Sequence, residues 1–276
     1  MFKKRILTLL SSTILVAGLA VGCGSNSGAG SSSEAKVTVS GSTSVGSPME
    51  NLAEAFEANN PDVKVEVQQL GSSAGIKNAI EGVSEIGMSS RDLKDEEKSA
   101  GLKETIIATD GIAVITNKAN SVTDLTLDQV RDIYTGKITN WKEVGGKDAP
   151  IVVVSREDGS GTRDGFQEKV GFESEELVKD AQISDGSGNI KSTVEGNENA
   201  IGYISFGYVD DAVNAVKVDG VEINHETVAN NEYVIARPFI LVNKEGISDN
   251  AQALIDFILS DEGQSILEEK GFIRVN

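Results

Sequence analysis

The sequence predicts an α/β fold with a largely parallel sheet, because strand-like and helix-like segments alternate along it. Val37–Ser40 predicts a short strand, and Val63, Val65 and Val67 alternate with polar residues in a second one. A turn of small residues and then apolar residues at helical spacing follow each strand. Parallel strands need such crossovers, since a tight hairpin can only join antiparallel strands.

The first predicted helix begins near a capping box. Ser47-Pro48-Met49-Glu50 places a serine three residues before a glutamate, with proline at the first helical position. Leu52, Ala53 and Phe56 then follow at helical spacing, and Asn59-Asn60-Pro61 ends the helix. We therefore expect a helix over residues 48–59.

The remaining elements continue the alternation. A helix follows the turn Gly71–Gly75, and a second capping box, Thr126-Leu-Asp-Gln129, predicts a helix that ends before Gly136. The predicted later strands are Ile86–Ser90, two apolar runs within Ile106–Asn117 that break at Asp110-Gly111, Ile151–Val154, Ala200–Ile204, Ala215–Val218 and Pro238–Val242. The C-terminal residues from Leu254 to Leu267 predict helices.

The composition excludes several classes of function. The chain has 276 residues with 25 basic and 43 acidic side chains, a net charge of −18, so nucleic acid is not an expected partner. One cysteine allows no intrachain disulfide, and no cluster of histidine and cysteine predicts a metal site. A pocket for an anion remains compatible with this charge, because surface charges are screened beyond about 8 Å at physiological salt.

The N-terminal residues predict export and anchoring. Residues 1–22 combine a basic start, an apolar run and small residues, which is typical of a signal peptide. Ala20-Val21-Gly22-Cys23 resembles a bacterial lipobox, with Ala20 where leucine is usual, so we expect Cys23 to be lipidated. An ordinary secretory signal is the alternative. Residues 23–35 are rich in glycine and serine and predict a flexible tether.

Three turns share one design. Gly41–Ser44, Gly71–Gly75 and Gly159–Thr162 each place glycine and hydroxyl residues between a predicted strand and a predicted helix. The first N–H groups of a helix have no partner within the helix and favour anions. Arg156 adds a guanidinium that can hold two oxygens. We expect the three turns to converge on an oxyanion, although plain helix capping would use the same residues.

Several catalytic motifs are missing from the sequence. Gly188–Thr193 resembles the end of a phosphate-binding P-loop, but Ile190 stands where that loop needs glycine before Lys191. No Gly-x-Ser-x-Gly elbow occurs, and the single histidine, His225, lies in a polar stretch typical of a surface. Nucleotide hydrolysis and serine-hydrolase chemistry are therefore not expected.

The order of these motifs resembles the phosphate-binding component of bacterial phosphate ABC transporters. The resemblance runs from about Val37 to the C-terminus and rests on seven short motifs, at residues 41–43, 71–73, 86–92, 110–114, 134–141, 156–162 and 200–203. It implies a two-lobed periplasmic-binding-protein fold of type II, in which two hinge strands join two mostly parallel sheets flanked by helices. We expect one lobe at residues 36–114 plus 238–276 and the other at 115–237, with crossings near 113–117 and 236–239.

The same resemblance implies a set of ligand residues. They are Thr43, Ser44, Ser72, Ser90, Arg156, Ser160, Gly161 and Thr162, with Asp158 orienting the Arg156 guanidinium. Members of the family carry an aspartate at the position of Ser90; it accepts the proton of phosphate and repels sulfate. Here Asp110, which interrupts an apolar run, is either the substitute acceptor or a hinge-region aspartate paired with the backbone.

The resulting expectation is a phosphate-binding protein with no catalysis, no cofactor and no metal. It would act as a monomer on the outer face of the cell membrane, anchored through Cys23, and deliver phosphate to the permease subunits of an ABC transporter. A binding protein for sulfate or molybdate is the closest rival, because Ser90 lacks the repelling charge. A secreted phosphoesterase that uses the same turns, or a surface adhesin with a vestigial pocket, is also compatible with the sequence.

Overall fold

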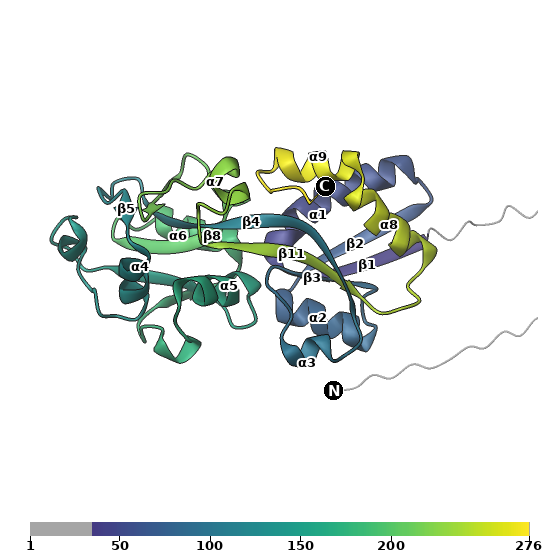
Figure 1. The fold of residues 1–276 in the computed structure, drawn as a ribbon, viewed down its shortest axis with the longest axis horizontal. Coiled ribbons are helices and arrows are strands. Elements are labelled where there is room, and N and C mark those ends of the chain that lie inside the picture. Colours follow the sequence, from purple (N-terminus) through teal and green to yellow (C-terminus); the bar gives the residue numbers. More distant parts are fainter. Residues whose placement is uncertain (1–34, 276) are drawn as a thin grey trace, which may run out of the picture. The chain divides into compact units, whose positions relative to one another are not determined.

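Two long strands, β4 (Lys103–Asn117) and β11 (Ala236–Asn243), run side by side between the two halves of the fold (Figure 1). A computed structural model describes residues 35–275 of the chain. β11 pairs antiparallel with β4 along its whole length, from Ala236 opposite Gly111 to Asn243 opposite Lys103. Other strands add to each side of this pair, so that two lobes share two hinge strands.

The first lobe has a central parallel strand covered on both faces. β1 (Ala35–Gly41) runs parallel to both β2 (Val63–Gln69) and β3 (Ile86–Ser89), and β3 pairs antiparallel with β11. The helices are α1 (Thr43–Asn59), α2 (Ser72–Glu81), α3 (Asp95–Lys98), α8 (Asp249–Leu259) and α9 (Asp261–Glu269). Alternate residues of β11 face opposite helices: Phe239 packs with α1, α8 and α9, whereas Ile240 packs with α2.

The second lobe repeats this plan. β8 (Ala200–Ser205) pairs antiparallel with β4 and parallel with β6 (Val152–Arg156), which pairs parallel with β7 (Gln182–Ser184). The other elements are β5 (Asp124–Leu125), β9 (Val213–Ala215), β10 (Lys217–Val218), α4 (Leu127–Tyr134), α5 (Gly161–Val170), α6 (Gly186–Glu195), α7 (His225–Ala229) and the 3-10 turns η1 (Trp141–Val144), η2 (Ser174–Glu176) and η3 (Phe206–Tyr208). The predicted α/β class with mostly parallel sheets flanked by helices is confirmed, and so is the capping box at Thr126.

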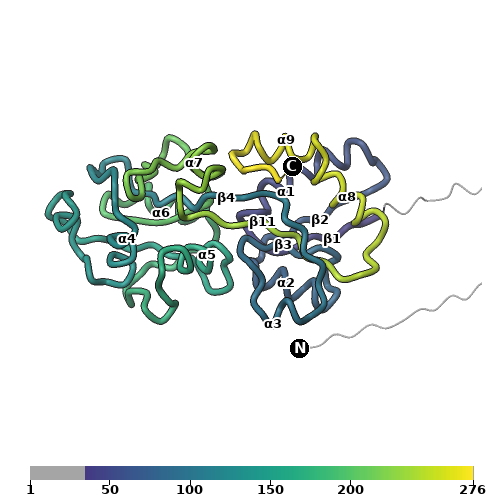
Figure 2. The backbone as a smooth tube through the Cα atoms, in the orientation of Figure 1, coloured from purple at the N-terminus to yellow at the C-terminus, as the bar shows by residue number. Residues whose placement is uncertain are grey.

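The two lobes have separate hydrophobic cores. Along β4, Ala108 packs in the first core and Ile112 in the second. Ile235, just before β11, packs in the second core, and Phe239 of β11 packs in the first. The chain therefore passes between the cores at residues 109–111 and 236–238, where β4 and β11 run between the lobes in Figure 2. Ile112, Ala113 and Val114 already pack in the second core, so the passage along β4 comes a few residues earlier than the crossing that the sequence suggested near 113–117.

The first helix begins earlier than the sequence predicted. α1 starts at Thr43, and the Ser42 side chain caps it by accepting a hydrogen bond from Val45 N. The predicted cap at Ser47 is wrong, because Pro48 lies inside the helix rather than at its first position. Both signals are good helix starts, and packing of Ser44 and Val45 in the interior favours the earlier one. Because of this earlier start, the end of the predicted turn 41–44 forms the N-terminus of α1.

Within residues 35–275, none of the helices is both long enough and apolar enough to cross a membrane.

Candidate functional site

The N-termini of four helices meet where the lobes face each other. Ser44 Oγ on α1 lies 2.9 Å from Thr162 Oγ1 on α5, and Ser73 N on α2 donates to Gly159 O just before α5 at 3.2 Å. A side-chain carbon placed on Gly186, at the start of α6, would lie 3.9 Å from Thr43. The three turns singled out in the sequence therefore converge. The fourth, α6, was missed as part of the site, because Gly188–Thr193 indicated only a helix start.

Serine hydroxyls line the first-lobe side. Ser42 Oγ donates to Ser90 Oγ at 2.8 Å, and Ser90 N donates to Ser72 Oγ at 3.0 Å. Ser72 and Ser90 are both buried, and their hydroxyl oxygens lie 3.3 Å apart. Ser90, one residue after β3, thus lies between the N-termini of α1 and α2.

The start of α5 forms the second-lobe side of the candidate site. Ser160 caps this helix by accepting from Arg163 N, and Thr162 is buried against Ser44. A side-chain carbon on Gly161 would collide with Ser72 Oγ and come 2.7 Å from Ser90 Oγ. Gly161 is therefore the point where α5 approaches the first-lobe serines most closely, and only glycine fits there.

Arg156 is the charged group of this cluster. It ends β6 and is buried, with 1% of its surface exposed. Its Nε and Nη2 donate to the two carboxylate oxygens of Glu157, both at 2.7 Å, and Nη2 also donates to Thr43 Oγ1 at 3.0 Å. Its Nη1 is buried and has no hydrogen-bond partner in the described part of the chain. A buried guanidinium nitrogen with unused donors is a place for a ligand oxygen.

Glu157, rather than Asp158, orients Arg156. Asp158 pairs instead with Arg163 at 2.6 Å, and 95% of its side chain is exposed. The predicted role of Asp158 is therefore wrong, because the longer Glu157 side chain reaches both guanidinium nitrogens and Asp158 points to solvent. Burial alone would raise the pKa of Glu157, but the hydrogen bonds and charge of Arg156 outweigh it and hold that pKa below its ordinary value.

Tyr203 holds the backbone of Arg156 in place. Its ring stacks on Phe166 of α5, with ring centroids 4.0 Å apart. Its hydroxyl accepts from Arg156 N at 3.1 Å and lies 2.8 Å from Ser155 Oγ. Burial raises the pKa of Tyr203, so the hydroxyl stays protonated. The contact joins β6, β8 and α5, the three elements that place the second-lobe residues.

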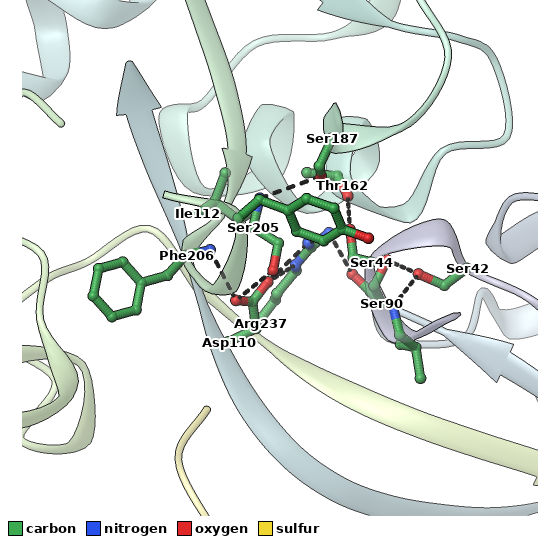
Figure 3. A network of polar contacts seen from close by, with 12 residues as sticks. Ser42, Ser44, Ser90, Asp110, Ile112, Thr162, Ser187, Ser205, Phe206 and Arg237 are labelled. Carbon is green, nitrogen blue, oxygen red and sulfur yellow. Dashed lines mark hydrogen bonds and ion pairs between the residues drawn. The ribbon is translucent and has the colours of Figure 1, made fainter. Parts of the chain in front are cut away.

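Asp110 occupies the hinge. It is fully buried; Oδ2 accepts from Arg237 Nε at 3.1 Å and Nη2 at 2.9 Å, and Oδ1 accepts from Ser205 Oγ and Phe206 N (Figure 3). Burial raises the pKa of Asp110, and the charge of Arg237 opposes that rise. Of the two roles that the sequence left open for Asp110, these contacts favour the hinge aspartate.

Arg237 was missed in the sequence. It lies directly before the predicted strand Pro238–Val242 and inside β11, and a charge next to a predicted apolar strand was the signal that could have found it. Its Nη1 donates to Ser90 O at 3.0 Å and its Nη2 donates to Ser44 Oγ at 3.2 Å. Two of the predicted site residues therefore contact this second buried arginine.

Further contacts join the lobes beside the serine cluster. Arg91 Nε lies 2.9 Å from Asp164 Oδ2 on α5, while Glu97 holds the other end of the guanidinium. Tyr208 OH donates to Thr43 O at 3.1 Å.

Among residues 35–275 no group of three or more histidine, cysteine, aspartate or glutamate side chains could hold a metal ion. The arrangement is a set of hydrogen-bond donors suited to a tetrahedral oxyanion. Cys23 lies outside the described residues.

Comparisons with known proteins agree with this geometry. The PBP superfamily domain matches residues 26–262. The chain is 34% identical to the phosphate-binding protein PstS of Bacillus subtilis, over 99% of this chain and 94% of that protein, and 31% identical to PstS of Borreliella burgdorferi, over 87% and 90%.

Solved structures show the same fold. The crystal structure of a candidate phosphate ABC transporter substrate-binding protein from Clostridium perfringens, with phosphate bound, is 67% identical and has a TM-score of 0.86; it covers 87% of this chain and all of that one. An ABC-type phosphate transport receptor from Vibrio cholerae is 37% identical, with a TM-score of 0.75 and the same coverage.

Replacing Tyr203 with phenylalanine should lower the free energy of unfolding by about 1–3 kcal/mol, because Arg156 N would stay buried without an acceptor. Urea denaturation measures the change. Tyr134→Phe is the matched control: Tyr134 is buried in the same aromatic cluster, but its hydroxyl makes only a 3.4 Å contact, to Val154 O. An equal loss in both variants would contradict the supporting role of Tyr203.

Proposed function

The chain belongs to the PBP superfamily and to the PstS phosphate-binding proteins, and we propose that it captures inorganic phosphate between its lobes and delivers it to the permease of an ABC transporter. One observation carries the proposal: four helix N-termini converge between the lobes beside buried Arg156, whose Nη2 bonds Thr43 and whose Nη1 has no hydrogen-bond partner among residues 35–275. Helix N-termini and arginine together favour an oxyanion. The bound phosphate of the C. perfringens relative supports the choice of ligand.

The proposed ligand residues come from both lobes. The first lobe supplies hydroxyl and N–H donors, and the second supplies the charge and the start of α5. The proposed set is Thr43, Ser44, Ser72, Ser90, Arg156, Ser160, Gly161 and Thr162, which lie at the starts of α1, α2 and α5, at the end of β6 or just after β3. Because donors come from both sides, binding stabilises the closed arrangement of the lobes.

The proposed lobe boundaries follow the cores. One lobe comprises residues 35–108 plus 239–275 and the other residues 112–235, with the hinge at 109–111 and 236–238. Asp110 and Arg237 both fall inside this hinge. Closure then needs changes only in the short strand segments between the cores.

The proton of phosphate requires an acceptor. None of the eight proposed ligand residues carries a carboxylate, and Asp110 already receives donors on both oxygens. Hydroxyl groups both donate and accept, so the serines can accept the phosphate proton as well as donate to the other oxygens. Such a site favours phosphate over sulfate less strongly than a carboxylate would.

The protein is proposed to work outside the cytoplasm as a monomeric binding protein without catalysis. Residues 1–22 would direct export, Cys23 would carry the lipid anchor at the outer face of the membrane, and residues 23–35 would tether the lobes to it. Within this proposal the permease contacts the closed form.

Arg156→Ala should weaken phosphate binding at least about a hundredfold, because a bound anion would lose its buried cationic partner. Isothermal titration with inorganic phosphate measures the loss. Arg131→Ala, on the surface of α4, is the control and should bind as the parent protein does. Near-parent affinity in Arg156→Ala would place the binding site elsewhere.

Phosphate should bind about tenfold more tightly than sulfate, the worth of one hydrogen bond, because only phosphate offers a proton to the serine hydroxyls. Titrations on the acidic and the basic side of neutrality test this. Sulfate keeps its charge across that range, so its affinity should stay constant where phosphate changes charge. Sulfate binding as tight as phosphate would favour a sulfate or molybdate carrier instead.

Cys23→Ser should release the protein from the membrane of a bacterial host, because the thiol that carries the lipid is lost while the lobes are unchanged. Fractionation and intact mass spectrometry measure the anchor, and phosphate titration confirms that the released protein is folded. A parent protein that is already soluble and unmodified would instead indicate an ordinary secretory signal.

A further inference from the structure

A buried ion pair crosses the two hinge strands. Asp110 of β4 and Arg237 of β11 are register partners in the antiparallel pairing, and their side chains are 0% and 1% exposed. The guanidinium donates twice to the same carboxylate oxygen, from Nε and from Nη2. A buried pair of this kind is costly to dehydrate, and apolar side chains of similar size often replace one without loss of stability. Stability alone therefore does not explain this ion pair, and its role follows from the contacts that Asp110 and Arg237 make with other residues.

The carboxylate end of the pair is held by the second lobe. Ser205 Oγ donates to Asp110 Oδ1 at 2.9 Å and Phe206 N donates to the same oxygen at 3.2 Å, both just at the end of β8 (Figure 3). With these two donors and two from Arg237, the carboxylate cannot rotate without losing bonds. Asp110 thus fixes the guanidinium relative to the second lobe.

The guanidinium end reaches the first lobe. Arg237 Nη1 donates to Ser90 O at 3.0 Å and Nη2 donates to Ser44 Oγ at 3.2 Å. Arginine has donors only, so Ser44 Oγ is the acceptor of that bond. The Ser44 hydroxyl hydrogen is then free to point away from Arg237, toward Thr162 Oγ1 at 2.9 Å and the converging donors around it.

We propose that Arg237, held by Asp110, is a positioning residue for the anion site: it fixes Ser44 as a hydrogen-bond donor toward the ligand and ties Ser90 to the hinge. The inference rests on the proposed phosphate-binding function. Arg237 acts through Ser44 and Ser90 and needs no contact with the ligand itself. The pair also links the two lobes, since its carboxylate accepts from Ser205 of β8 and its guanidinium donates to Ser44 of α1 and to Ser90, which directly follows β3.

A double-mutant cycle in the full chain tests the coupling, with inorganic phosphate as the ligand and calorimetric titration as the readout. The variants are Ser44→Ala, Arg237→Lys and the two combined; lysine keeps the charge but cannot make the fork of bonds to Asp110, Ser90 and Ser44 at once. Each single variant should lose roughly tenfold in affinity or more, the worth of a charge-assisted hydrogen bond. The combined variant should bind within about threefold of the weaker single one, because both changes remove the same donor.

Two further variants separate positioning from general damage. Gln264→Met removes a fully buried polar side chain whose bonds, to Ile107 O, Ile258 O and Val275 N, involve none of the proposed ligand residues, so it should lower the melting temperature but leave phosphate affinity unchanged. Asp110→Leu combined with Arg237→Met replaces the whole pair by apolar side chains, which keeps the hinge filled if Arg237→Lys fails to fold. This folded variant should also bind phosphate roughly tenfold more weakly or worse.

The outcomes are distinct. Losses that multiply in the combined variant, or parent-like affinity in the apolar replacement, would overturn the positioning role of Arg237 while phosphate binding by the parent protein stands. A parent protein that binds no phosphate would instead overturn the proposed function, and the inference with it.

Discussion

The unpaired N–H groups at the first turns of α1, α2, α5 and α6 are the constraint on which the arrangement of the lobes depends. Each helix leaves its first N–H groups without an internal partner, and burying them is costly unless an acceptor is supplied. Here the four N-termini face one another between the lobes, and the hydroxyls of Ser42 and Ser160 accept from first-turn N–H groups of α1 and α5. An oxyanion with four oxygens is the natural acceptor for the rest.

Charge at this interface is balanced pair by pair. Arg156 has Glu157, Arg237 has Asp110, and Arg91 has Glu97 and Asp164. Positive potential for a ligand therefore comes from helix N-termini and from Nη1 of Arg156, which has no hydrogen-bond partner among residues 35–275, rather than from surplus basic side chains. This explains how a chain with a net charge of −18 can hold an anion: the field that matters is local, and the surface charge is screened.

Sequence patterns predicted the elements well and their first residues less well. The capping box at Thr126 is real, whereas the equally good one at Ser47 is not, because Ser42 caps α1 five residues earlier and Pro48 is accommodated inside the helix. Local signals of similar strength cannot be ranked without knowing which turn is buried. The same limit applies to Asp158 and Glu157: adjacent carboxylates look alike in sequence, and only the direction of each side chain separates them.

By itself the sequence determined the α/β class, the three glycine- and hydroxyl-rich turns and Arg156, because turn chemistry and strand–helix alternation are local properties. The tertiary structure alone decided that α6 joins the site and that Asp110 faces Arg237. Those two residues lie 127 positions apart and meet through the register of β4 with β11, which depends on packing of both cores. A charge in an apolar run signals a partner, but register rather than sequence selects which one.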